Sequence, residues 1–378
     1  MMYGRQPRLI FWETTRSCPL RCRHCRAAAE PSPLPGELST AEGLAWIESC
    51  ARWEAPRPIL VLTGGDLLAR PDHLELVTRA RSLGLTVAVS PSVSDRLTPG
   101  VMQRWADLGV SSVSFSLDGA TAASHDAHRG VPGTFGATWK AIADAEAEGL
   151  RVQVNTTVLP GRLDELAGLI PLLKLHRIPV WEVFFLVRTG RATTLAELTP
   201  DACGAAANLL YDASRYGIVV RAVEGPWLRR VAREREAGTP RPTLGAYPAI
   251  AARLSRRLGP PTHPSSIAPT GTLDGDGIVF VGHDGTIAPG GLMDLPIGSV
   301  VTDDLRSIYQ DHPLLRAIRA RRFTGPCGGC PAKGYCGGSR ARALAATGDP
   351  LGSDPACPFV PGSGAAPPVA AAAEGCPG

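Results

Sequence analysis

The stretch Thr15-Arg16-Ser17-Cys18-Pro19-Leu20-Arg21-Cys22-Arg23-His24-Cys25 carries three cysteines with the spacing C-x3-C-x2-C, directly after an apolar run that begins at Leu9. We call Cys18, Cys22 and Cys25 the cysteine triad. Three thiolates cannot pair off into disulfides, and they are one ligand short of a closed tetrahedral zinc site. The spacing suits an iron-sulfur cluster with one iron open to a small molecule, and the neighbouring arginines favour thiolates. A zinc site that recruits a distant fourth ligand is the alternative.

The chain around the triad alternates short β-rich runs with amphipathic helical patterns. Six strands are predicted, at residues 9–15, 59–63, 86–90, 112–117, 151–158 and 180–187. This alternation predicts an α/β fold with a parallel sheet covered by helices, either an open Rossmann-like sheet or a partial barrel. No G-x-G-x-x-G follows the first strand. The triad occupies that loop instead, at the carboxyl edge of the sheet, where parallel α/β folds carry their chemistry.

Two further motifs stand at predicted strand ends. Thr63-Gly64-Gly65-Asp66 closes the second strand, and the amides and carbonyls of such a turn can bind a charged amino-acid group. Ser116-Leu117-Asp118-Gly119 closes the fourth strand, and His125-Asp126-Ala127-His128-Arg129-Gly130 follows it. Taken singly, each motif also fits an ordinary turn, with Arg129 as a surface charge.

Together with the triad, these motifs resemble the signature of the radical S-adenosylmethionine (SAM) superfamily. In that family the open iron chelates SAM, whose reductive cleavage gives a 5'-deoxyadenosyl radical that abstracts hydrogen from a substrate. The resemblance implies that Thr63, Gly64, Gly65 and Asp66 contact the methionyl amino group, although Asp66-Leu67 replaces the usual Glu-Pro. It also implies that Ser116 and Arg129 contact the methionyl carboxylate of SAM. Further SAM contacts implied by the resemblance are Asp118, Asn155, Leu186 and His24. No catalytic residue is assigned.

A second group of cysteines lies near the C-terminus, with the spacing C-x2-C-x5-C-x20-C: Cys327, Cys330, Cys336 and Cys357. Four thiolates complete one iron-sulfur cubane or one zinc site, and the spacing does not distinguish the two metals. The surrounding sequence resembles the SPASM module of the radical SAM branch that includes haem d1 and alternative-haem biosynthesis enzymes. That resemblance implies one auxiliary 4Fe-4S cluster, because the stretch Ala288-Pro289-Gly290-Gly291 has no cysteines for another.

The predicted architecture is therefore a partial (β/α)6 TIM-type barrel with a small C-terminal SPASM/twitch-like iron-sulfur domain. We expect the barrel over residues 1–225, a helical, Pro/Gly-rich bridge over 226–274, the auxiliary-cluster domain over 275–360 and a disordered tail over 361–378. Cys50 and Cys203 fall in helical patterns and are expected to pack as small apolar residues. Cys376 falls in the tail and is expected to have no fixed role.

Composition narrows the class of function. The chain has a net charge of +4 and no run of eighteen apolar residues, so we expect a soluble cytoplasmic protein with no nucleic-acid or membrane partner. The resemblance implies an enzyme that takes an electron from a donor such as flavodoxin or ferredoxin. The expected reaction is hydrogen abstraction from a small biosynthetic intermediate. The alternatives are oxidative decarboxylation or removal of tetrapyrrole side chains as in haem biosynthesis, ribosomal peptide modification, and, outside enzymes, a zinc-stabilised binding protein.

Overall fold

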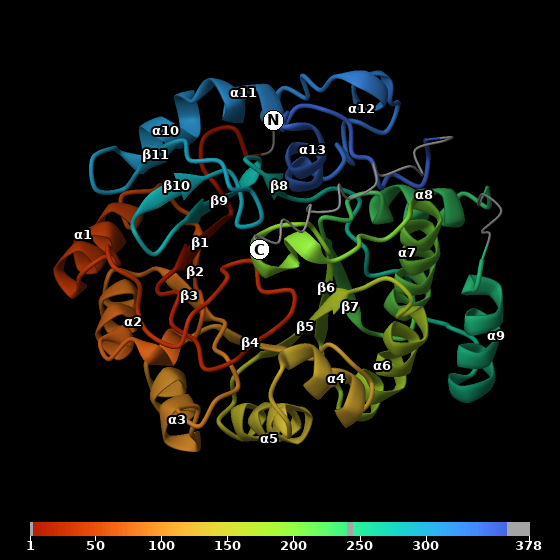
Figure 1. Cartoon of the computed structure of the whole chain (residues 1–378), viewed down its shortest axis with the longest axis horizontal. Coiled ribbons are helices and arrows are strands. Elements are labelled where there is room, and N and C mark those ends of the chain that lie inside the picture. Colours follow the sequence, from red (N-terminus) through yellow and green to blue (C-terminus); the bar gives the residue numbers. More distant parts are fainter. Residues whose placement is uncertain (1–2, 240–244, 361–378) are drawn as a thin grey trace, which may run out of the picture.

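The computed structural model describes residues 3–239 and 245–360. Seven parallel strands form a curved sheet in sequence order: β1 (Leu9–Glu13), β2 (Ile59–Thr63), β3 (Thr86–Val89), β4 (Ser112–Ser116), β5 (Val152–Val158), β6 (Val180–Phe185) and β7 (Val219–Val223). Figure 1 looks into this partial barrel, with helices arranged around its outside. The predicted α/β class and partial barrel are confirmed, and β1–β6 match the six predicted strands.

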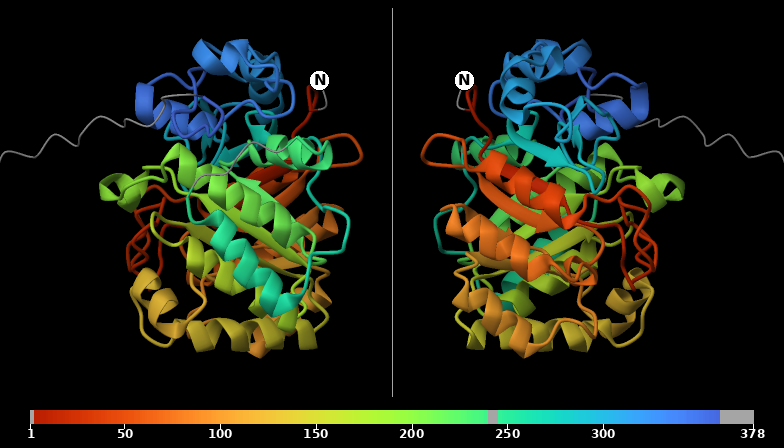
Figure 2. Two further views of the ribbon diagram at one scale, coloured as in Figure 1. Left: turned by 90° about the vertical axis from the view of Figure 1, so that its right-hand side faces the viewer. Right: turned by 90° about the vertical axis from the view of Figure 1, so that its left-hand side faces the viewer.

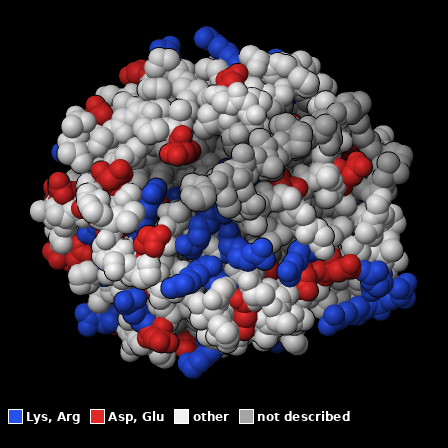
Figure 3. All heavy atoms as spheres, viewed as in Figure 1, with Lys and Arg blue, Asp and Glu red and all other residues white. Residues whose placement is uncertain are grey.

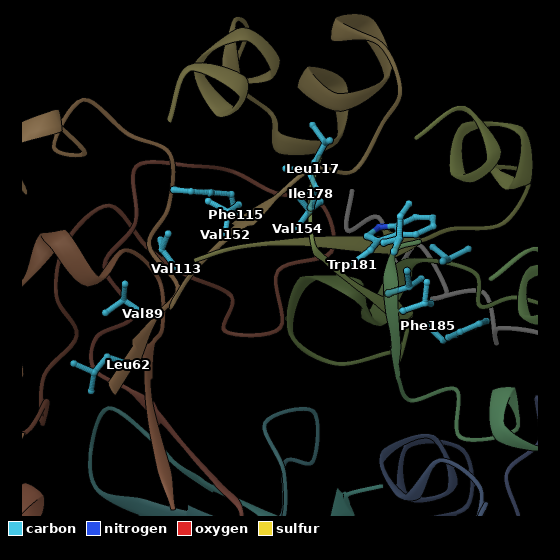
Figure 4. Close-up of a cluster of buried hydrophobic side chains, with 14 of the residues drawn as sticks. Leu62, Val89, Val113, Phe115, Leu117, Val152, Val154, Ile178, Trp181 and Phe185 are labelled. Carbon is cyan, nitrogen blue, oxygen red and sulfur yellow. The ribbon is translucent and has the colours of Figure 1, made fainter. Parts of the chain in front are cut away.

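The outer layer consists of helices that connect successive strands: α1 (Thr40–Cys50), α2 (His73–Ser82), α3 (Pro99–Asp107), α4 (Ala122–Arg129), α5 (Thr134–Ala147), α6 (Leu163–Leu175), α7 (Pro200–Ser214), α8 (Leu228–Glu236) and α9 (Tyr247–Leu258). Strand residues alternate between the outer face, which is buried against these helices, and the barrel interior. The core therefore lies between sheet and helices, and Figure 4 draws 14 of its side chains, with labels on ten of them from Leu62 to Phe185.

Strand β7 is missing from the sequence prediction, which treats residues 199–237 as helices. Its sequence, Val-Val-Arg-Ala-Val, is only five residues long and lies between two amphipathic helices. The strand is defined by its parallel pairing with β6, a tertiary contact that no local pattern encodes.

The C-terminal part continues the same sheet. Strand β9 (Gly277–Val281) pairs in parallel with β1, while β10 (Thr286–Ala288) returns antiparallel beside β9 and forms a hairpin with it. The remaining short strands are β8 (Leu273–Asp274) and β11 (Gly298–Ser299). Because β9 pairs with β1, the first strand of the barrel is also the attachment point of the C-terminal part. The residue boundaries given above for the separate domains remain predictions.

Four short helices complete this part: α10 (Leu305–Asp311), α11 (Pro313–Arg319), α12 (Gly325–Gly329) and α13 (Arg340–Thr347). Figure 2 shows them gathered on one side of the barrel, away from α3 and α5. The sequence pattern predicts one helix over 303–321. The structure has two, because Pro313 cannot donate a backbone hydrogen bond and begins a new helix.

Two expectations fall partly or wholly outside the described residues. The expected disordered tail, 361–378, and its Cys376 lie there, as do residues 240–244 of the expected bridge. Across the ranges that are described, no helix has both the length and the apolar character needed to cross a bilayer.

Candidate active site

A cavity of about 740 Å³ occupies the barrel interior and opens among the loops that follow the strands. Its volume lies within the roughly 300–1,000 Å³ usual for ligand sites. On β1, β2 and β9 its wall is apolar: Leu9, Phe11, Ile59, Val61, Ile278 and Phe280. On β4 and β5 its wall is polar, with Ser112, Ser114, Gln153 and Asn155, and β6 and β7 add Glu182 and Arg221 among apolar residues. The two walls suit a ligand that has a broad apolar face and polar substituents.

The cysteine triad lies in the loop after β1, at the mouth of this cavity. Cys18 and Cys22 are buried and Cys25 is half-buried, packed with Leu20 and Ala29. Arginines dominate this loop, and Figure 3 shows Lys and Arg side chains gathered near the middle of the same face. The predicted placement of the triad at the carboxyl edge of the sheet is thus confirmed.

Each sulfur of the triad accepts a hydrogen bond. The Leu20 amide lies 3.4 Å from the Cys18 sulfur, and the Ala29 amide lies 3.5 Å from the Cys25 sulfur. The Arg129 guanidinium donates to the Cys22 sulfur at 3.3 Å. Burial raises the pKa of the Cys18 thiol, while a contact with Ser92 and the Leu20 amide oppose that shift. Donors aimed at sulfur favour thiolate ligands, so the residues present fit an iron-sulfur cluster.

The 3-10 helix η2 (Gly190–Thr194), which follows β6, holds the triad loop from the other side. The Arg191 amide donates to the Cys25 carbonyl at 2.9 Å, and its guanidinium donates to the carbonyls of Cys22 and Ala29. A Cβ on Gly190 would come within 2.2 Å of the Arg26 carbonyl, so only glycine allows this approach. Sequence reasoning missed Arg191, because its role depends on a contact across more than 160 residues.

The glycines after β2 make a close contact with the chain that leads to the triad. The Gly65 amide donates to the Thr15 carbonyl at 2.7 Å, and a Cβ on Gly65 would lie 2.4 Å from the Ser17 carbonyl. Gly64 has a φ of +140°, and a Cβ there would lie 2.4 Å from the Thr15 carbonyl. The chain leading to the triad, rather than a ligand alone, therefore demands Gly64 and Gly65. Both still line the cavity, as does Thr63.

Asp66 is turned away from the cavity lining and stabilises the next loop. Its buried carboxylate accepts hydrogen bonds from the Leu68 amide at the start of η1 (Leu67–Ala69) and from the Ser94 hydroxyl at 2.8 Å. Burial raises the pKa of this carboxyl group. A ligand contact by the Asp66 side chain therefore has no support in this geometry, whereas its backbone stays next to the Gly64-Gly65 turn.

Asp118 and Arg129 form a buried ion pair beside the triad. Arg129 Nε lies 3.1 Å from Asp118 Oδ2, and Asp118 Oδ1 accepts the Thr157 amide at 2.7 Å. Burial alone would raise the pKa of Asp118, but the Arg129 charge holds it well below the usual range. Arg129 thus bridges a fixed carboxylate and the Cys22 sulfur, and it lines the cavity where a ligand carboxylate would meet its charge.

His24 stacks on His128 with a ring separation of 4.3 Å, next to Asp118. Burial lowers the pKa of His24 to about 3, so the ring is neutral at physiological pH. Ligand atoms of His24, Asp118 and His128 lie within 4.8 Å of one another, a spacing that a metal ion could use. The Arg129 guanidinium, which pairs with Asp118, opposes a cation there.

The remaining predicted ligand residues also line the cavity. Ser116 and Asn155 pair in register on β4 and β5, and the Asn155 side chain accepts a hydrogen bond from Gln153 at 2.8 Å. Leu186, just after β6, is buried beneath the cavity wall, and its carbonyl accepts the Arg342 guanidinium at 3.0 Å. Ser116, Asn155 and Leu186 therefore come together with Thr63, Gly64, Gly65 and His24 around one space.

The second group of cysteines surrounds α12 and α13. Cys327 and Cys336 are buried, and Cys330 and Cys357 are half-buried. The four thiols lie close enough to affect one another's ionisation, and burial raises the pKa of Cys336 to about 12 and that of Cys357 to about 11. The Ala332 amide donates to the Cys330 sulfur at 3.4 Å. Four thiols brought together fit a metal site in which the protein fills every coordination position. Metal binding must displace the protons of these thiols.

Two fully buried arginines lie beside this group, and one of them, Arg342, connects it to the barrel. Arg340 donates to the Gly352 carbonyl at 2.6 Å, with its Nη2 3.8 Å from the Cys327 sulfur. Arg342 pairs with Asp354 and donates to the carbonyls of Phe185, Leu186 and Glu224 at the ends of β6 and β7. The closed cysteine site and the cavity therefore share one wall. Cys50 and Cys203, by contrast, pack in the core, as expected.

Comparison with known proteins identifies the family. The model of the radical SAM superfamily matches residues 12–170. The chain is 34% identical to an AdoMet-dependent heme synthase of Nitratidesulfovibrio vulgaris over 94% of this chain and 93% of the relative. It is 28% identical to a pre-heme d1 synthase of Dinoroseobacter shibae over 94% of this chain and 87% of the relative.

Among solved structures, SuiB of Streptococcus suis bound to S-adenosylmethionine superposes with a TM-score of 0.65 at 12% identity, over 93% of this chain and 77% of SuiB. A second structure holds SuiB with its precursor peptide SuiA. SuiB supports the fold alone, whereas the full-length relatives decide the family. The chain belongs to the radical SAM superfamily and is an enzyme that binds SAM and a 4Fe-4S cluster, which removes the zinc-stabilised binding protein from consideration.

Proposed function

We propose that this enzyme oxidatively decarboxylates propionate side chains of an iron porphyrin in the formation of haem. The observation that carries the proposal is its similarity to an AdoMet-dependent heme synthase over nearly the whole of both chains. From the sequence alone, a small biosynthetic intermediate of any kind is expected, with a tetrapyrrole as the alternative. The full-length similarity moves the tetrapyrrole to first place.

The triad supplies three thiolates to the SAM-cleaving cluster, in a loop held by Gly65 and Arg191. When bound, this cluster and SAM supply the 5'-deoxyadenosyl radical. Arg129 binds the methionyl carboxylate of SAM, because it is a buried guanidinium whose position Asp118 determines. The other proposed SAM contacts share the cavity mouth with Arg129: Thr63, Gly64, Gly65, Ser116, Asn155, Leu186 and His24.

The four C-terminal cysteines hold one auxiliary 4Fe-4S cluster with no open position. Arg340 supports this assignment, since a guanidinium near the Cys327 sulfur stabilises a negatively charged site. An iron-sulfur cluster also agrees with the family better than zinc does. A donor such as flavodoxin or ferredoxin supplies the electron for SAM cleavage.

The cavity supports a porphyrin in two respects. Its apolar wall on β1, β2 and β9 can accept the face of a macrocycle, and the opposite wall offers polar groups to side chains. A peptide is the second candidate, because SuiB, which shares the fold, is seen with its precursor peptide. The likeness to SuiB is at 13% identity, so it concerns the fold alone.

The test is anaerobic turnover with the cluster-loaded enzyme, SAM and dithionite. Iron coproporphyrin III should stimulate 5'-deoxyadenosine release and lose CO2 and two hydrogens for each propionate processed, as followed by mass spectrometry. An unrelated leader peptide should give neither signal. If the porphyrin gives no stimulation and no mass change while a peptide does, the proposed substrate is wrong.

A variant separates SAM binding from substrate recognition. Arg129→Gln should weaken SAM binding by about tenfold or more, because a charge-assisted hydrogen bond is lost. Binding of the porphyrin, measured by its absorbance without SAM, should stay unchanged. Equal SAM affinity in Arg129→Gln and wild type would remove Arg129 from the SAM site.

A further inference from the structure

Seven arginines of the described chain line the cavity. Five of them are held by a carboxylate or by backbone carbonyls of the protein: Arg26, Arg129, Arg191, Arg229 and Arg340. The other two are Arg8, which precedes β1 at the edge of the sheet opposite to the triad, and Arg221, in the middle of β7. Both residues are exposed. Arg221 is therefore the arginine of the strand wall whose charge is left for a ligand.

Arg221 belongs to a row of polar side chains that crosses four strands of the barrel wall. Ser116 on β4 pairs in register with Asn155 on β5. Glu182 on β6 pairs with Asn155 on one side and with Arg221 on the other, and all four residues line the cavity. Ser116 and Asn155 are proposed SAM contacts, whereas Glu182 and Arg221 lie on the next two strands. The row therefore continues from the SAM site into the part of the cavity that is left for the substrate.

Gln153, on β5, holds the Arg221 side chain in position. The amide nitrogen of Gln153 donates to Asn155 Oδ1 at 2.8 Å and to Glu182 Oε2 at 3.0 Å. Because both protons of this nitrogen are used there, the amide oxygen is left to face Arg221. That oxygen accepts a hydrogen bond from Arg221 Nη1 at 3.4 Å. Asn155 and Glu182 thus act on Arg221 through the orientation of one amide group.

Most donors of Arg221 are left for a ligand, since a guanidinium has five N–H groups. Within residues 3–239 and 245–360, the contact with Gln153 is the only hydrogen bond of the Arg221 side chain, and this side chain forms no ion pair. The Glu182 carboxylate is held by Gln153 instead; burial raises its pKa, while the charge of Arg221 opposes that shift. Nε and Nη2 of Arg221 therefore remain as the two parallel donors that a carboxylate accepts.

We propose that Arg221 binds a carboxylate of the substrate through a bidentate contact, and that Gln153 holds the guanidinium in place for it. This inference rests on the proposed function, because the propionate side chains of a porphyrin provide such a group. Arg221 lies three strands from Ser116, which is about 14 Å along the sheet at about 4.8 Å per strand. The bound carboxylate is therefore not the reacting one. It orients the macrocycle so that another propionate faces the SAM site.

The experiment measures binding to the cluster-loaded enzyme, by porphyrin absorbance, of two probes: iron coproporphyrin III and its tetramethyl ester. Arg221→Gln removes the charge, and Arg221→Lys retains it without the planar fork of donors. We expect the affinity for the acid to fall by about tenfold or more in the Gln variant and by less in the Lys variant. The affinity for the ester should be the same in all three proteins, because an ester has no charge for Arg221 to bind.

Arg253→Gln is the matched control. Arg253 is also an exposed arginine, but it pairs with Asp164 outside the cavity, so this variant should bind both probes as the wild type does. Gln153→Leu tests the positioning role, because it keeps the guanidinium and removes its support. It should weaken binding of the acid by less than Arg221→Gln does and leave binding of the ester unchanged. Equal losses for both probes would make Gln153 a part of the cavity wall and no more.

The outcomes separate this inference from the proposed function. Unchanged binding of the acid in Arg221→Gln, or equal losses for acid and ester, would overturn the inference. Turnover of iron coproporphyrin III by the wild type would leave the proposed function standing in that case. A wild-type enzyme that binds neither probe, and whose 5'-deoxyadenosine release neither stimulates, would remove the proposed function and this inference with it.

Discussion

Replacing Glu13 by glutamine tests how the triad loop is attached to the fold. Glu13 ends β1 and is fully buried. Its carboxylate lies 2.8 Å from Arg26 Nη1, 2.9 Å from Arg16 Nε and 3.3 Å from His283 Nδ1. Arg16 and Arg26 belong to the triad loop, and His283 belongs to the turn between β9 and β10. Glu13 therefore joins two segments that meet only in the folded chain.

The size of the effect follows from the pKa. Burial alone would raise the pKa of Glu13, but Arg26, His283 and Arg16 together lower it from 4.5 to about 2. An acid whose pKa is lowered by folding stabilises the folded state at pH values above its unfolded pKa. That contribution is lost as the pH falls toward the folded pKa. A pKa lowered from 4.5 to about 2 contributes about 3 kcal/mol at pH 7 and about 2 kcal/mol at pH 3.5.

Urea unfolding of the metal-free protein at both pH values measures this contribution. The Glu13→Gln variant should lose about 3 kcal/mol of unfolding free energy at pH 7, and the gap to wild type should narrow at pH 3.5. Glu48→Gln is the control, because Glu48 forms an exposed pair with Arg79 and should cost about 1 kcal/mol or less. A Glu13→Gln loss under about 1 kcal/mol at pH 7, or an equal loss at both pH values, would refute the reasoning.

Three further predictions concern the metal sites. Replacing the whole triad with alanine should lower iron content from about eight to about four per chain and abolish 5'-deoxyadenosine release, and continued release would contradict the assignment. Gly65→Ala should reduce iron loading, because its Cβ would lie 2.4 Å from the Ser17 carbonyl, while Gly136→Ala, with no atom within 4 Å of the added Cβ, should load fully. Equal loading of these two variants would mean that the turn does not hold the loop. Cys203→Ala should keep about eight irons per chain, since burial raises the pKa of this thiol to about 12. The variant should lose about 1 kcal/mol of unfolding free energy. A drop in iron content would make Cys203 a ligand.

The sequence predicted those parts of the site that consist of short local motifs. Each of three motifs is a short continuous segment: the triad, the Gly64-Gly65 turn and the stretch from Asp118 to Arg129. The strand and helix pattern placed all three at one edge of the sheet. The structure redirected Asp66 toward Ser94, because a buried carboxylate that begins a 3-10 helix is already satisfied by its own loop. It also added β7, whose pairing with β6 has no local signature.

The sequence by itself determined the chemistry of this protein: the number and spacing of its thiolates, the alternation that makes a parallel sheet and the family to which it belongs. Only the tertiary structure decided how these parts meet. Arg191 reaches the triad loop, Glu224 reaches Ser339 and Arg342 reaches the ends of β6 and β7 across separations that no periodic pattern encodes. The physical reason is that burial leaves each of these charged groups few possible partners, and the partners are supplied by the packing of distant strands.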